Sequence, residues 1–169
     1  MRLHIGGEEP KAGWKILNVQ NMPHVDFVGD IVDLTQFDDQ SVIEIYASHV
    51  LEHVTHSRVS QTLKGIHRVL RPGGKFYVSV PDMDTLCHTF INPILPLDIK
   101  YHVMGMMFGG QVDAHDFHCF GWNQLIMWDQ LRKAGFSVLE RVASFGLFND
   151  TSDFQPYGFP VSLNVIATK

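Results

Sequence analysis

The sequence has 169 residues, of which 45% are hydrophobic and 18% are charged. This length fits a single domain, residues 1–169, and the composition is that of a folded globular protein rather than a disordered one. The formal net charge of −5 argues against a nucleic-acid-binding surface, because binding to phosphates requires a basic stripe.

Cysteine usage and the lengths of the apolar runs predict a cytoplasmic protein without membrane contact. Cys87 and Cys119 show no CxxC or zinc-type spacing, so free thiols in a reducing compartment are expected. The N-terminus has no basic-then-apolar signal region. No apolar run reaches the ~18 residues that indicate a membrane span.

Short apolar runs in the first half predict buried strands, and all of them except 15–19 are closed by a glycine or polar group. The runs are 3–5, 15–19, 25–28, 42–47 and 75–80. The closing groups are Gly6-Gly7, Gly29-Asp30, Ser48-His49 and Pro81-Asp82. Because ligands of parallel sheets bind outside the carboxyl ends of the strands, these groups predict a binding site at that edge.

Two helices are predicted from apolar residues at helical spacing. The first has an apolar face made by Val59, Leu63, Ile66, Val69 and Leu70. Thr55 or Ser57 can cap its start, and residues 72–74 are expected to end it. The second helix covers 123–134, with Gly135 as its stop, and strands are expected over 137–145 and 161–168. This alternation predicts an α/β protein with right-handed crossovers and a mainly parallel sheet.

Two blocks of the sequence resemble the middle of class I S-adenosylmethionine-dependent methyltransferases. They are VGDIVDLTQFDDQSVIEIYASHVLEHV (28–54) and LKGIHRVLRPGGKFYVSVPD (63–82), and LHIGG near the start adds to them. The resemblance covers roughly the first half of the chain. It implies a Rossmann-like fold with five parallel strands, an antiparallel C-terminal strand, helices on the faces, and S-adenosyl-L-methionine as cofactor.

The same resemblance implies a cofactor site. Gly6 and Gly7 would let the backbone approach the amino-acid end of the cofactor, although a simple tight turn would also explain them. Asp30 and Ile31 would meet the adenine, although a solvated aspartate at a strand end is the alternative. The implied cofactor-binding residues are Gly6, Gly7, Asn18, Gln20, Asp30, Ile31, Ala47 and Ser48.

The sequence departs from this family at two points. Residues 8–10 follow Gly6-Gly7 and the next strand begins almost at once, so the usual first helix has no room. The acidic residue expected at the end of the second strand, which holds the ribose, is absent. Asn18 and Gln20 stand nearest to that position, and Glu8 or Glu9 could compensate.

Three histidines are candidate general bases: His49, His53 and His118. A histidine with a pKa near its ordinary value of ~6.5 can take the proton of an oxygen nucleophile, although His49 could equally make a structural hydrogen bond. Residues 49–53 also spell H-x-x-E-H, the inverted zinc-peptidase motif. That motif requires both histidines on one helical face, whereas here it leaves a predicted strand.

A second polar cluster lies in an expected loop between Gly109 and Gly121. Its members are Asp113, His115, Asp116 and His118. Such a cluster can bind a divalent metal, supply acid–base groups or form a hydrogen-bonded cap. We assign no metal ligand in it. The apolar neighbours of His118 predict that this histidine is buried, and the preceding stretch 83–110 predicts a substrate lid or an added helix.

The expected function is methyl transfer to an oxygen or nitrogen of a small-molecule acceptor, with a carbohydrate or glycan precursor as the suggested class. One alternative is a non-catalytic binding or scaffolding protein that keeps the fold without the activity. Another is a zinc-dependent hydrolase built on H-x-x-E-H. A homo-oligomer that completes the cofactor pocket is also conceivable, and no nucleic-acid partner is expected.

Overall fold

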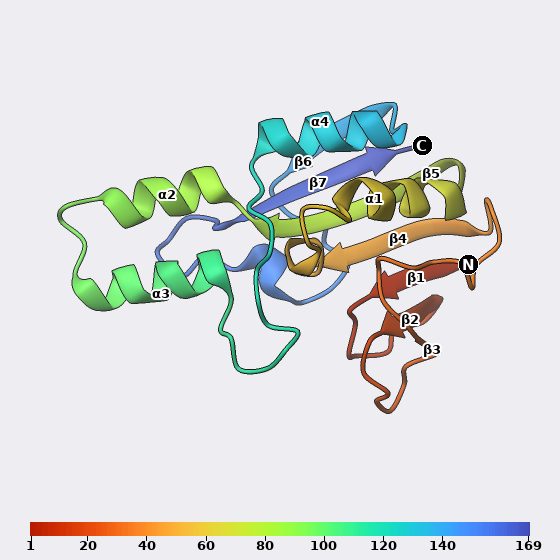
Figure 1. The fold of residues 1–169 in the computed structure, drawn as a ribbon, viewed down its shortest axis with the longest axis horizontal. Coiled ribbons are helices and arrows are strands. Elements are labelled where there is room, and N and C mark those ends of the chain that lie inside the picture. The colour runs from red at the N-terminus through yellow and green to blue at the C-terminus, as the bar shows by residue number, and fades with distance from the viewer.

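Seven strands form one sheet in the order β3-β2-β1-β4-β5-β7-β6 in the computed structural model, which describes residues 1–169 (Figure 1). The strands are β1 (Arg2–Ile5), β2 (Trp14–Asn18), β3 (Phe27–Val28), β4 (Val42–Ser48), β5 (Leu70–Pro81), β6 (Val138–Val142) and β7 (Ser162–Thr168). Strands β1 to β5 are parallel, and β7 is antiparallel to both β5 and β6. The expected α/β fold, with a mainly parallel sheet and an antiparallel C-terminal strand, is confirmed.

Four α-helices and two short 3-10 turns complete the fold. They are α1 (Val59–Val69), α2 (Met83–Ile91), α3 (Leu97–Phe108), α4 (Gln124–Ala134), η1 (Leu51–His53) and η2 (Thr151–Asp153). The stretch 83–110, expected to hold a lid or an added helix, forms α2 and α3, which project as a hairpin from one end of the sheet (Figure 1). No helix of the chain is long and apolar enough to cross a membrane.

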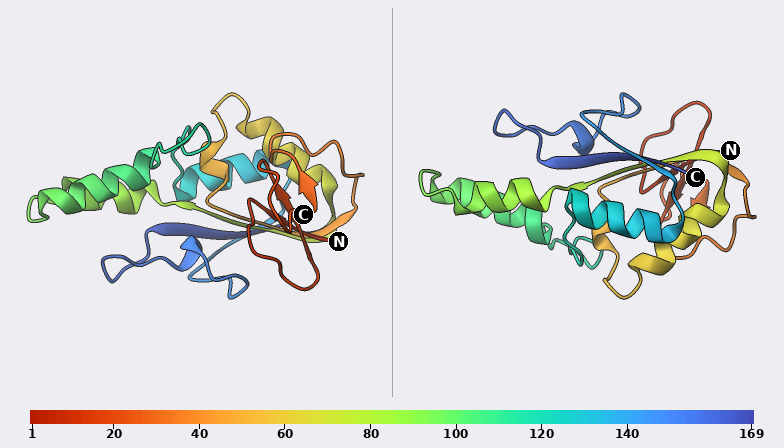
Figure 2. Two further views of the ribbon diagram at one scale, coloured as in Figure 1. Left: turned by 90° about the horizontal axis from the view of Figure 1, so that it is seen from below. Right: turned by 90° about the horizontal axis from the view of Figure 1, so that it is seen from above.

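One face of the sheet packs against α1, α4 and the irregular segment 31–37 (Figure 2). Alternate residues of each strand point to this face, as strand geometry requires. Along β4, for example, Ile45 and Ala47 are fully buried against it. The apolar face predicted for the helix at 59–69 supplies Leu63 and Ile66 to the same core.

The opposite face is covered by the connection between β6 and β7, residues 143–161, which contains the short η2 but no α-helix (Figure 2). The ring of Phe148 lies 4.1 Å from that of His4, 4.5 Å from that of Tyr46 and 5.2 Å from that of Trp14, between centroids. The Lys11 ammonium lies 4.8 Å above the Phe148 ring. No helix lies between β1 and β2, as the sequence predicted, and a C-terminal segment covers this part of the sheet.

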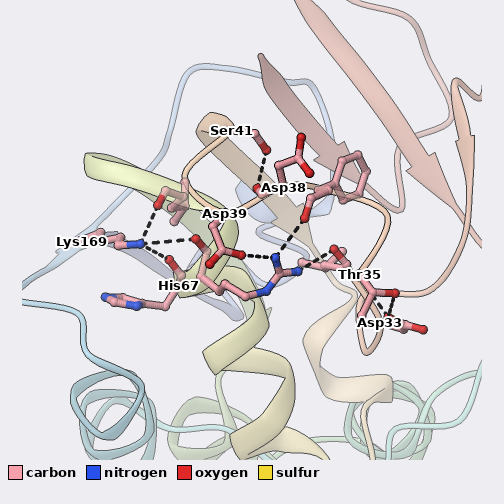
Figure 3. Close-up of polar contacts among 11 residues, drawn as sticks. Asp33, Thr35, Asp38, Asp39, Ser41, His67 and Lys169 are labelled. Carbon is pink, nitrogen blue, oxygen red and sulfur yellow. Dashed lines mark hydrogen bonds and ion pairs between the residues drawn. The ribbon is translucent and has the colours of Figure 1, made fainter.

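The predicted ends of the first helix are wrong. Arg58 occupies the N-cap position of α1 without a side-chain cap, and the hydroxyls of Thr55 and Ser57 lie 3.4 Å apart and pair with each other instead. The helix ends at Val69, before residues 72–74, because the extended backbone of β5 already begins at the next residue. The free carbonyls at this end accept hydrogen bonds from the Lys169 ammonium, at 2.7 Å from His67 and 2.7 Å from Leu70 (Figure 3).

The Arg68 guanidinium on α1 ties the irregular segment 31–37 to this helix and also bonds Asp39, which is labelled in Figure 3. Arg68 donates to the carbonyls of Leu34 at 2.8 Å and Phe37 at 3.0 Å, and it pairs with Asp39 at 2.6 Å. The segment has no helix of its own, so these bonds replace the backbone pairing that a helix would supply.

We expect Arg68→Met to lower the free energy of unfolding by about 1–2 kcal/mol, because two carbonyls lose a charged donor. The exposed ion pair with Asp39 should add little. Urea denaturation of both proteins measures the difference. Asp39→Asn is the control, and an equal loss in that variant would contradict the assignment to the carbonyls.

Candidate functional site

A cavity of about 420 Å³ lies at the carboxyl ends of β1, β2 and β4. Its size is within the usual range for small-molecule sites. Of the eleven residues expected from the sequence to bind the cofactor or act as bases, six line it: Gly6, Asn18, Asp30, Ile31, His49 and His53. The edge of the sheet on which the sequence placed a binding site therefore carries a cavity.

The Gly6-Gly7 turn closes directly after β1 without a helix. Gly6 has φ +75°, and a side-chain carbon there would lie 2.5 Å from a methyl carbon of Val50, so the position requires glycine. At Gly7 a side-chain carbon would lie 2.5 Å from the His4 ring. Gly6 borders the cavity, whereas Gly7 does not. The carbonyl of Gly7 accepts a hydrogen bond from Asn18 at the end of β2.

At the end of β2, both the nitrogen and the oxygen of the Asn18 side-chain amide are hydrogen-bonded within the protein. Asn18 is buried, its Nδ2 donates to the carbonyl of Gly7 at 3.1 Å, and its Oδ1 accepts from the backbone N–H of Gln20 at 2.9 Å. Gln20 is exposed and lies outside the cavity wall. The carboxylate that borders the cavity near this strand is Glu8, whereas Glu9 does not reach it.

The segment after β3 forms another part of the wall. Asp30 is exposed to the cavity, and its Oδ1 accepts a hydrogen bond from the backbone N–H of Val32 at 3.2 Å. Ile31 belongs to the main core and also borders the cavity. A carboxylate and an apolar side chain therefore lie side by side in this part of the wall.

Neither Ala47 nor Ser48, at the end of β4, lines the cavity. Ala47 is fully buried in the core. The Ser48 hydroxyl points to the opposite face and donates to Asp150 at 3.2 Å, and the hydroxyl of Tyr46 donates to the same carboxylate at 2.7 Å. Burial opposes ionisation of Asp150, but the hydrogen bonds from Ser152, Tyr46 and Ser48 keep its pKa below the ordinary value.

The turn after β4 places a carboxylate among imidazoles. His49, at φ +53°, has its Nδ1 3.2 Å from Glu52 Oε1 and its Nε2 3.0 Å from the Ser162 hydroxyl. Glu52 is only 1% exposed. His118 comes from the loop 109–121, and its Nε2 lies 4.0 Å from the same Glu52 oxygen. Burial lowers the pKa of His118, although the nearby Glu52 carboxylate acts in the opposite direction.

His53 joins this cluster from the cavity side. Its Nδ1 lies 3.1 Å from the carbonyl of Phe117, and its ring meets that of His118 edge-on with centroids 5.0 Å apart. The backbone N–H groups of Cys119 and Phe120 both donate to the carbonyl of Glu52, at 2.8 Å and 3.1 Å. The loop 109–121 is therefore tied to η1 at the site.

The other members of the second polar cluster stabilise the loop itself. Asp113 accepts from the backbone N–H of His115 at 2.7 Å, and Asp116 accepts from that of Val112 at 3.3 Å. His115 borders the cavity, whereas His118 points to Glu52. Asp113 and Asp116 therefore form a hydrogen-bonded cap of the loop, whereas His118 belongs to the cluster around Glu52.

The zinc-peptidase geometry is not formed by residues 49–53. Leu51–His53 make a single 3-10 turn, and His49 precedes it in a left-handed conformation, so the two histidines do not lie on one helical face. Sequence reasoning missed Val50, Arg58 and the residue pair Phe117 and Cys119 as wall residues. No local pattern indicated them, since the loop reaches the site through its contacts with η1.

The comparisons with known proteins agree with this architecture. A family profile described as "Methyltransferase domain" matches residues 11–78. No protein with a curated description matches the chain significantly. Among solved structures, a SAM-dependent methyltransferase from Archaeoglobus fulgidus has a TM-score of 0.60 at 13% identity, covering 99% of this chain and 85% of that one.

Two further structures show the same fold. The 1,6-didemethyltoxoflavin-N1-methyltransferase of Burkholderia thailandensis, solved with bound 1,6-didemethyltoxoflavin and S-adenosylhomocysteine, has a TM-score of 0.59 at 16% identity. The match covers 99% of this chain and 70% of that one. A chain of the Haloferax volcanii complex between the methyltransferase activator Trm112 and a methyltransferase has a TM-score of 0.58 at 16% identity. The match covers 99% of this chain and 80% of that one. The profile match over residues 11–78 and the shared fold make the chain similar to methyltransferase domains.

Proposed function

We propose that the cavity binds S-adenosylmethionine and that the chain transfers its methyl group to an oxygen or nitrogen of a small polar acceptor. The observation that supports this most strongly is the composition of the cavity wall. Gly6, Asp30 and Ile31 line one part of it, and His49 and His53 line another. One cavity thus combines surfaces for a nucleoside with groups that can accept a proton.

In this proposal the adenine packs on Ile31 and its amino group donates to Asp30. The backbone near Gly6 approaches the amino-acid end of the cofactor. Glu8 is the carboxylate that can reach the ribose, because the amide of Asn18 already bonds Gly7 and Gln20. Gln20, Ala47 and Ser48 then act indirectly, by shaping the strand ends.

Methyl transfer requires alignment of the acceptor with the methyl group and removal of a proton from the acceptor. His53 and His49 border the cavity and are the candidate bases. His118 stands behind Glu52 and does not line the cavity, so it would act through that residue. Arg58 and Thr55 make the remaining wall polar, which supports a hydroxylated acceptor such as a carbohydrate or glycan precursor.

We expect Asp30→Ala to weaken S-adenosylhomocysteine binding by about 1–3 kcal/mol, because the adenine loses a charged acceptor. Calorimetric titration of both proteins measures the difference. Asp129→Ala on the exposed side of α4 is the control, since its partner is Lys133. An affinity unchanged in Asp30→Ala would remove this residue from the site.

A non-catalytic protein with this fold is the second candidate. It is favoured by the missing helix after β1 and by the occupied amide at the end of β2. The same titration separates the two, because the absence of heat and of thermal stabilisation at millimolar ligand would leave a binding or scaffolding role. A cytoplasmic location and a homo-oligomer remain predictions.

A further inference from the structure

Glu52 carries a buried carboxylate with no hydrogen-bond partner on either oxygen. Burying an unpaired carboxylate costs several kcal/mol, so such a group is expected to meet a proton or a cation. Its ion-pair partners are imidazoles alone, His49 at 3.2 Å and His118 at 4.0 Å. The charge of Glu52 therefore has no permanent cation among the side chains beside it.

We propose that Glu52, His53 and His118 bind one divalent transition-metal ion. One ligand atom of each residue lies within 4.8 Å of the corresponding atoms of the other two. The sequence assigned no metal ligand here, because His118 lies 66 positions beyond Glu52 and reaches it only through the folded loop. The ion would neutralise a buried carboxylate whose oxygens have no hydrogen-bond partner.

The surroundings of the two histidines resemble those of metal ligands, in which the second ring nitrogen is anchored by a hydrogen bond. The Nδ1–H of His53 can donate to the carbonyl of Phe117 at 3.1 Å, which leaves Nε2 with a free lone pair. The ring of His118 presents Nε2 toward Glu52 Oε1 at 4.0 Å. Both rings thus place a nitrogen where an ion beside Glu52 could be bound.

His49 completes the arrangement from outside the ligand set. Its Nε2 contacts the Ser162 hydroxyl and its Nδ1 faces Glu52, so it fixes the direction of the carboxylate. A positioning residue of this kind typically contributes 10–100-fold to metal affinity.

The ligand types select the class of metal. Two imidazoles and one carboxylate suit zinc or another divalent first-row ion, whereas calcium and magnesium prefer oxygen ligands alone. Three protein ligands leave at least one coordination position open, and His53 borders the cavity. That position would hold an oxygen of the acceptor and favour loss of its proton, so His53 would then be a ligand and not the base. This role rests on the proposed methyl transfer, whereas metal binding itself does not.

Metal titration of the chelator-treated protein tests the site. We expect one equivalent of Zn²⁺ to bind by calorimetry, and one equivalent of Co²⁺ to give visible absorption bands of a nitrogen–oxygen site. Glu52→Gln and His118→Asn should each weaken binding at least about tenfold, and His49→Asn about 10–100-fold. His88→Asn, on the exposed side of α2, is the matched control and should bind as the wild type does.

Two results would overturn the proposal: no stoichiometric binding to the wild type, or unchanged binding in Glu52→Gln. His53→Asn, at a more exposed position, keeps the test valid if His118→Asn fails to fold. S-adenosylhomocysteine titration in the presence of chelator separates this inference from the proposed function. Cofactor binding without zinc binding removes only the metal site, and zinc binding without cofactor binding removes only methyl transfer.

Discussion

Phe148→Ala is expected to lower the free energy of unfolding by about 2–4 kcal/mol, which is the cost of truncating a large aromatic side chain in a packed cluster. The phenylalanine stands in the connection between β6 and β7, yet it contacts the rings of His4, Trp14 and Tyr46 on the first strands of the sheet. Its loss leaves a cavity over the part of the sheet where no helix follows β1. The effect should therefore far exceed that of an ordinary loop substitution.

Phe154→Ala is the matched control, since it lies in the same connection and is 43% exposed. Its loss should cost less than about 1 kcal/mol, as surface changes usually do. Urea denaturation followed by tryptophan fluorescence gives both values, with the slope checked for constancy. Equal losses in the two variants would show that the connection does not replace the missing helix as a cover for the sheet.

Much of the sheet could be predicted from the sequence, because apolar runs and helical spacing are patterns of residues that are neighbours in the chain. Apolar runs such as 42–47 and 75–80 are long enough to identify buried strands, and the spacing of Leu63 and Ile66 identifies the helix between them. The strand predicted at 25–28 is shorter, since β3 has only two residues. At Asp26 the N–H still donates to the carbonyl of Ile16, but the side-chain carboxylate accepts from the N–H of Ile16 in place of a backbone carbonyl.

What could not be predicted depends on contacts between distant residues. Lys169 ends α1 from the far end of the chain, and Phe148 meets His4 across most of the sequence. No pattern near residue 59 or residue 4 contains that information. The loop 109–121 likewise becomes part of the site only because Cys119 and Phe120 bond the carbonyl of Glu52.

The candidate site was predicted at the correct edge of the sheet, because each closing group follows a strand directly. Individual side chains were harder to place. Strand alternation alone sends Ala47 to one face and Ser48 to the other, so the two could not both face one cavity. The burial of Glu52 had no local signal, since charged residues are rarely buried unless they are paired.

The stability of the protein should fall by about 3 kcal/mol between pH 6.5 and pH 4 through one residue, His4. Burial lowers the pKa of His4 from 6.5 to about 4, and its Nδ1 has no hydrogen-bond partner. In this interval His4 is protonated in the unfolded chain but not in the folded protein. The contribution of His4 to the free energy of unfolding is therefore fully present above pH 6.5 and is lost as the pH falls. The interval between the two pKa values corresponds to about 3 kcal/mol.

His4→Phe keeps an aromatic ring against Phe148 and removes the titrating group. Because burial also lowers the pKa values of His67 and His118, the wild type loses additional stability in the same direction. The test is therefore the difference between the two proteins in urea denaturation at pH 7.5 and pH 4.5. We expect the wild type to lose about 2–3 kcal/mol more than His4→Phe over this interval. Parallel losses in the two proteins would mean that His4 is protonated in the folded state, and that the aromatic cluster around Phe148 opens to water.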